Sequence, residues 1–131
     1  MQLIKQLLEG KFLRIIAIGY TIFVTVIMLV PISKGPTINF PYADKIVHSI
    51  IYFVFVIVWL TYFLISEKEN KRIYLIVSLV LFVYGIVIEV LQGSVVASRA
   101  HDNWDIVANT IGIILGVIVF YKTKDVFLSK K

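Results

Sequence analysis

The chain has 131 residues, of which 60% are hydrophobic and 16% charged, with no cysteine and a formal net charge of +5. A soluble domain this short could not cover apolar runs of about 20 residues, whereas a bilayer accepts them directly. The absence of cysteine excludes disulfides, thiolate metal sites and cysteine nucleophiles. Because basic residues gather at the cytoplasmic ends of membrane helices, the positive charge indicates topology, and we expect no nucleic-acid partner.

The first predicted transmembrane helix covers residues 12–32, since the stretch from Ile15 to Ser33 contains no charged residue. The segment before it, MQLIKQLLEGK, is amphipathic. We expect this lead-in to be a short separate element along the inner membrane interface. All three prolines of the chain lie in the connection that follows the helix, which predicts one long loop there.

Three further transmembrane helices are predicted over residues 45–66, 73–92 and 102–121. The first two are joined by the short charged segment EKENKR, which favours an antiparallel hairpin. The uncharged part of the last is short, so this helix reaches across the roughly 30 Å hydrocarbon layer only if it begins near Asp102. No internal repeat is present, and we expect a single membrane domain over residues 1–131.

The distribution of lysine and arginine predicts the orientation of these helices. With the N-terminus in the cytoplasm, all but three of the 13 basic residues fall on the cytoplasmic side, and the exceptions are Lys34, Lys45 and Arg99. The opposite orientation would reverse this ratio. The sequence therefore predicts an all-α polytopic membrane protein, an antiparallel four-transmembrane-helix bundle with cytoplasmic N- and C-termini.

Polar residues gather at the level where this topology brings together the start of the second helix, the end of the third and the start of the fourth. They are Asp44, Lys45, His48, Glu89, Gln92, Arg99, Asp102, Asp105 and Asn109. Asp44 and His48 are four residues apart, Glu89 and Gln92 are three apart, and Asp102, Asp105 and Asn109 follow at intervals of three and four, which places each set on one side of its helix. We therefore expect three polar stripes that all turn inward and form a ligand-binding pocket on the extracytoplasmic side.

Glu89 and His48 are the two members with the clearest alternatives. A charge inside a transmembrane segment is costly unless it is paired, protonated or facing water, so Glu89 either has a functional task or forms an interhelical salt bridge with Arg99 or Lys45. His48 could be a general acid or base whose ring Asp44 orients. It could equally hydrogen-bond the carboxylates without chemistry.

The polar stripe of the fourth helix also allows two interpretations. Asp102 could be only the N-cap of the helix, which makes Asp105, one turn deeper and in line with Asn109, the better functional candidate. The same stripe continues into Gly112 and Gly116, a GxxxG pattern that favours close helix packing. Zinc or a hard cation could also be bound by Asp44, His48, Glu89 and Asp105, but no HExxH or comparable spacing supports this, and we predict no metal and no cofactor.

Three blocks of the sequence carry a resemblance to a known family: DKIVHSIIY over residues 44–52, EVLQG over residues 89–93 and RAHDNWDIVANTIGIILG over residues 99–116. Together they resemble the signature of VanZ-like membrane proteins, the family named for a teicoplanin-resistance protein. The resemblance implies a multi-pass protein of the bacterial plasma membrane. It implies that the family's motif positions are Asp44, Lys45, His48, Glu89, Gln92, Arg99, Asp102, Asp105, Asn109, Gly112 and Gly116.

Three functions remain open at this point. The first is a binding module for membrane lipids, a lipid-linked cell-wall precursor or a glycopeptide antibiotic. The second is a membrane-embedded hydrolase or transferase of envelope lipids with His48, Glu89 and Asp105 as catalytic residues and Arg99 steadying an anionic group, although no nucleophile stands out. The least favoured is a proton-coupled transporter, because the polar residues lie near one surface and the inner half of the bundle has none to complete a path, although a homo-oligomer could supply one.

Overall fold

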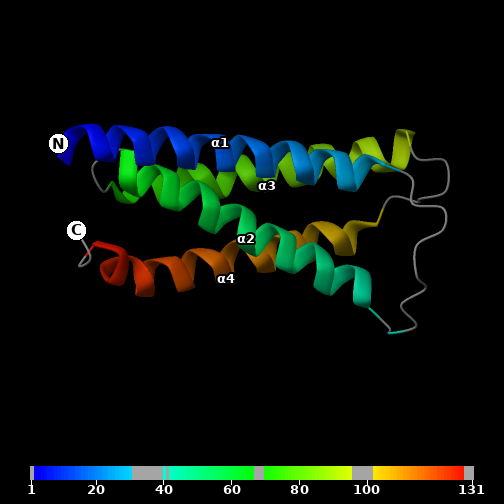
Figure 1. Ribbon diagram of the computed structural model, residues 1–131. Coiled ribbons are helices and arrows are strands. Elements are labelled where there is room, and N and C mark those ends of the chain that lie inside the picture. The colour runs from blue at the N-terminus through cyan, green and yellow to red at the C-terminus, as the bar shows by residue number, and fades with distance from the viewer. Residues whose placement is uncertain (1, 31–39, 41, 67–69, 96–101, 129–131) are drawn as a thin grey trace.

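Four long helices make up the part of the chain that the computed structural model describes, residues 2–30, 40, 42–66, 70–95 and 102–128 (Figure 1). They are α1 (Gln2–Leu29), α2 (Ala43–Ser66), α3 (Lys71–Val95) and α4 (Asn103–Leu128). Each contains a stretch of 21 to 25 residues that is long and apolar enough to cross a membrane. The predictions of an all-helical structure and of four helices long and apolar enough to cross a membrane are thus confirmed.

All four helices extend beyond their predicted spans, α2 and α3 by two or three residues at an end and α1 and α4 by more. α1 begins at Gln2 and continues through Glu9 and Gly10 into the apolar stretch, so the amphipathic lead-in is the start of this helix and not a separate element. α4 continues past Tyr121 to Leu128. Neither terminal segment contains proline, and charged residues such as lysine and glutamate are good helix formers, so polarity alone does not end a helix there. The predicted loop over residues 31–39 lies outside the described residues.

α2 is the central helix of the bundle. It contacts α1, α3 and α4, and Figure 1 shows it crossing α4 diagonally: near the chain termini it lies beside α1 and α3, and at the opposite end it lies on the other side of α4. Both chain termini lie at one end of the molecule in the same view, while α2 and α4 begin at the opposite end. We refer to this opposite end, where Lys45 and Asp102 lie, as the distal end.

The surface of the bundle is as apolar as its interior. Side chains such as Ile15, Leu75 and Val95 are more than 60% exposed, and most helix positions that face outward carry valine, isoleucine or phenylalanine. A soluble protein rarely exposes a continuous apolar surface of this kind, whereas lipid covers it without cost. Between the helices, the buried core consists of Val24, Met28, Tyr52, Phe55, Val56, Leu60, Val77, Leu81, Ile88, Ile113 and Phe120.

Two glycines bring α4 directly against α2. A Cβ atom added at Gly112 would overlap the carbonyl oxygen of Ser49, and one at Gly116 would overlap a methyl group of Val56. Any larger residue at either position would force the two helices apart. The close approach predicted from the GxxxG pattern is confirmed, and it places the first turn of α4 beside the first turn of α2.

Candidate functional site

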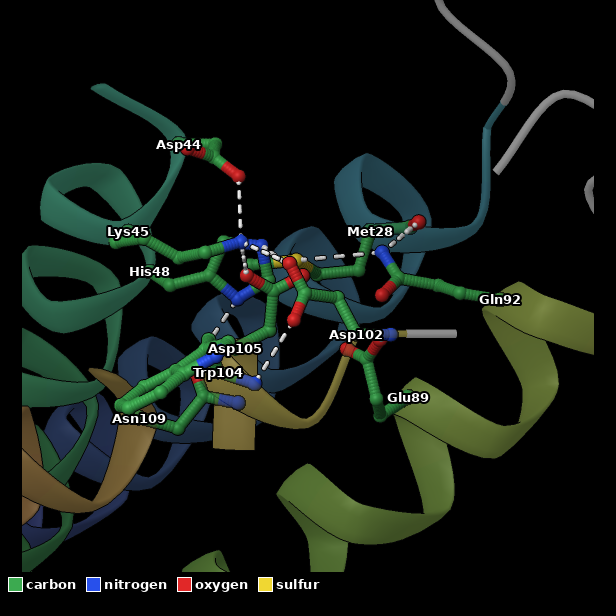
Figure 2. A network of polar contacts seen from close by, with 10 residues as sticks. All are labelled: Met28, Asp44, Lys45, His48, Glu89, Gln92, Asp102, Trp104, Asp105 and Asn109. Atoms are coloured by element: carbon green, nitrogen blue, oxygen red, sulfur yellow. Dashed lines mark hydrogen bonds and ion pairs between the residues drawn. The ribbon is translucent and has the colours of Figure 1, made fainter. Parts of the chain in front are cut away.

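Lys45 lies at the centre of three aspartates at the distal end (Figure 2). Its Nζ atom donates to the Oδ2 atom of Asp44 at 2.7 Å, to the Oδ2 atom of Asp102 at 2.5 Å and to the Oδ1 atom of Asp105 at 2.5 Å. Asp44 and Lys45 belong to the first turn of α2, and Asp102 and Asp105 lie at the start of α4. We call these four residues the Lys45 cluster.

The members of the Lys45 cluster differ in their access to the surface. The side chain of Asp44 is 59% exposed and that of Asp102 40%, whereas Lys45 is 20% and Asp105 only 14% exposed. The inward position predicted for Asp44 is therefore wrong: in the first turn of α2 its carboxylate turns outward to reach the ammonium group of Lys45. The cluster runs from an open rim at Asp44 to a nearly closed base at Asp105.

His48 lies one turn deeper in α2 and is buried. Its Nδ1 atom donates to the Oδ1 atom of Asn109 at 3.1 Å, and its Nε2 atom is 3.9 Å from the Oδ2 atom of Asp105. Asn109 of α4 thus orients the imidazole ring, with Asp105 of the same helix nearby, and the role predicted for Asp44 in orienting it is wrong. The reason is that Lys45 draws the Asp44 carboxylate away while the close crossing of the helices brings α4 against His48.

Glu89 is buried near the distal end of α3, with an exposed fraction of 2%. Its Oε1 atom accepts a hydrogen bond from the backbone N–H of Asp102 at 3.0 Å, where the N-terminal end of α4 favours negative charge. Among the described residues Lys45 pairs with the aspartates and not with Glu89, so the alternative of a salt bridge between these two is wrong. The other predicted partner, Arg99, lies outside the described residues.

Asp102 serves the fold and the cluster together. Its Oδ1 atom accepts a hydrogen bond from the backbone N–H of Trp104 at 2.9 Å, which makes it the predicted N-cap of α4. Its Oδ2 atom faces Lys45. One carboxylate oxygen therefore satisfies the helix end while the other takes part in the ion pair, so neither interpretation excludes the other.

One contact of the predicted residue Gln92, and one further residue, Tyr52, were not predicted from the sequence. Gln92, which is buried, donates through Nε2 to the backbone carbonyl of Met28 at 2.6 Å and ties α3 to the end of α1. No side-chain pattern could have identified a backbone acceptor. Tyr52, one turn beyond His48, is fully buried, and its hydroxyl has no hydrogen-bond partner within the described part of the chain. The signal in the sequence was its spacing of four residues from His48, which places the two side chains on the same side of α2.

The three aspartates also have the spacing of a cation site. One carboxylate oxygen from each of Asp44, Asp102 and Asp105 lies within 4.8 Å of the other two. The ammonium group of Lys45 lies within hydrogen-bond distance of all three, at the position that a metal ion would need. A cation would therefore have to displace Lys45. Of the metal ligands considered from the sequence, His48 and Glu89 do not belong to this group of three carboxylates.

Among the described residues of the distal end, the carboxylates of Asp44, Asp102 and Asp105 all face the ammonium group of Lys45, and those of Asp44 and Asp102 are also accessible from the surface. This arrangement suits groups that donate hydrogen bonds or carry positive charge. Comparisons with protein-family models, with curated proteins and with solved structures find no match to this chain.

Proposed function

We propose that this chain is a VanZ-like protein of the bacterial plasma membrane whose distal end binds, on the extracytoplasmic side, the polar headgroup of an envelope lipid, a lipid-linked cell-wall precursor or a lipoglycopeptide antibiotic. The three sequence blocks that resemble the family support the assignment. The excess of lysine and arginine near both termini and between α2 and α3 supports an antiparallel bundle with cytoplasmic termini.

The observation that carries this proposal is the graded Lys45 cluster. Asp44 and Asp102 stand at an accessible rim, and Asp105 lies behind them at 14% exposure. Amino or amide groups of a ligand could enter at the rim and compete with Lys45 for carboxylate oxygens. A site in which every acceptor was already enclosed would not admit a ligand in this way.

Apolar side chains beside the cluster fit the amphipathic character of these ligands. Tyr42 and Trp104 are 75% and 70% exposed, and each lies within two residues of a cluster aspartate. Ile46 and Val47, next to Lys45, are also exposed. Aromatic residues in such positions commonly lie at the membrane interface, where they would contact the upper part of a lipid tail while the headgroup reaches the carboxylates.

Binding of defined ligands to the protein in nanodiscs tests the proposal. A lipid-linked cell-wall precursor and a lipoglycopeptide would be titrated against the wild type, Asp105→Asn and the control Asp125→Asn, which alters an exposed carboxylate of α4 near the chain terminus. Loss of a charge-assisted hydrogen bond should weaken binding about tenfold or more in Asp105→Asn only. Failure of every ligand to bind the wild type, or equal binding to all three proteins, would contradict the proposal.

A membrane-embedded hydrolase or transferase is the second candidate, favoured by the position of His48 between Asp105 and Asn109. An imidazole that is held at one nitrogen by Asn109 and faces a carboxylate with the other can transfer a proton if a substrate group reaches it. Incubation with a panel of envelope lipids, followed by mass spectrometry, distinguishes the two. A product formed by the wild type and absent with His48→Gln would favour the enzyme, whereas unchanged lipids that still bind would exclude it.

A further inference from the structure

An apolar groove of about 210 Å³ lies between α1, α2 and α3, separate from the distal cluster. It is lined by Thr21 of α1, by Phe55, Trp59 and Phe63 of α2, and by the side of α3 that runs from Ile76 to Tyr84. Ile76 and Val80 are 57% and 60% exposed, so the groove opens toward the surface that lipid covers.

The polar atoms in the walls of this groove already have partners. The Oγ1 atom of Thr21 donates to the backbone carbonyl of Ala17 at 2.8 Å and accepts from the indole N–H of Trp59 at 3.3 Å. The hydroxyl of Tyr84 is hydrogen-bonded to the Oγ1 atom of Thr25 at 2.7 Å. The groove therefore presents carbon to its occupant, which suits a hydrocarbon chain and not water.

The length of the groove also suits a hydrocarbon chain. From Ile76 to Tyr84 the α3 wall rises by roughly 12 Å at 1.5 Å per residue. This is less than half of the roughly 30 Å hydrocarbon layer, so the wall can align one acyl chain within a single leaflet.

Two arginines lie beyond the groove at the end of the molecule that carries the termini. Arg14 precedes Thr21 by seven residues and Arg72 precedes Ile76 by four, spacings that place each arginine on the helix side that lines the groove. The Nε atom of Arg14 donates to the hydroxyl of Tyr62 at 3.1 Å, and its guanidinium carbon lies 5.8 Å from the centre of that ring. Tyr62 thereby holds Arg14 at this end of the groove.

The charge of these arginines is not neutralised within the described part of the chain. The ion pairs found there all involve the distal residues Lys45 and His48, and neither Arg14 nor Arg72 pairs with a carboxylate. Two unneutralised guanidinium groups at the end of an apolar groove are complementary to a molecule with a negative headgroup and a hydrocarbon tail.

We propose that this groove binds one anionic phospholipid, with an acyl chain against α3 and the phosphate group contacting Arg14 and Arg72. The site lies at the opposite end of the bundle from the Lys45 cluster and does not depend on the function proposed for that cluster.

Competition between phosphatidylglycerol and phosphatidylcholine for the purified protein, measured by native mass spectrometry, tests the proposal. The wild type should retain phosphatidylglycerol preferentially. Arg14→Gln/Arg72→Gln should weaken this retention about fivefold for each arginine removed. The control Lys122→Gln/Lys124→Gln removes two charges of α4 at the same end of the molecule but away from the groove, and it should leave phosphatidylglycerol retention unchanged.

A second pair of variants tests the groove itself. Val80→Phe places a ring in the groove and should reduce phosphatidylglycerol retention, whereas Val83→Phe alters a similarly exposed residue outside the lining and should not. The proposal would be overturned by equal retention of the two lipids in the wild type, by unchanged retention in Val80→Phe, or by equal losses in the lysine and arginine double variants.

Discussion

Replacing Lys45 by methionine removes the positive charge that three aspartates share at the distal end. The contacts with Asp44 and Asp102 are partly exposed and therefore contribute up to about 1 kcal/mol each, while the charged hydrogen bond to the less exposed Asp105 contributes about 1.5–3 kcal/mol. We expect Lys45→Met to lower the free energy of unfolding by about 2–4 kcal/mol, because three carboxylates then face one another.

The same substitution should create a cation site. The carboxylate oxygens lie within 4.8 Å of one another, which a Ca²⁺ ion with contacts of roughly 2.3–2.6 Å can bridge. Thermal unfolding of the purified protein, followed by tryptophan fluorescence, should show stabilisation by Ca²⁺ in Lys45→Met and little in the wild type, where the ammonium group holds this position. Lys122→Met serves as the control. The reasoning is refuted if Lys45→Met unfolds like the wild type, or if Ca²⁺ affects both proteins equally.

Two further predictions concern unfolding of the same preparation. Gly112→Ala should lower the free energy of unfolding by about 1–3 kcal/mol, because its methyl group would push α2 and α4 apart. Gly19→Ala, with no atom within 4 Å of the new methyl group, should be neutral or stabilising. Similar losses of stability in both variants would contradict the close packing. Tyr84→Phe should cost about 1 kcal/mol through loss of the hydrogen bond to Thr25, more than Tyr52→Phe, and the reverse order would count against the described contacts.

The existence of the four helices could be predicted from the sequence because each requires only a long apolar run. Their ends could not be predicted equally well. The stretch around Glu9 and Gly10 and the charged residues after Tyr121 look like boundaries, yet the helices continue through them, since only proline or a strong turn signal breaks a helix once it has formed.

Helical spacing could predict which polar residues turn inward within a helix, but not their partners on other helices. It indicated that His48, Glu89 and Asn109 face the interior, and all three are buried. The partners depend on where α2 crosses α4 and on the rotation of each helix about its axis. A pattern along one helix does not contain that information, and so the pairing of Lys45 with Asp105 became visible only in three dimensions.

The orientation of the distal end in the membrane is the central claim on which extracytoplasmic binding depends. The chain contains no cysteine, so Tyr42→Cys and Asn70→Cys, both at exposed positions, can be labelled in intact bacteria with a membrane-impermeant maleimide without background. We predict that Tyr42→Cys is labelled from outside and that Asn70→Cys is labelled only after the membrane is opened. Labelling of Asn70→Cys in intact cells, with Tyr42→Cys protected, would contradict the account.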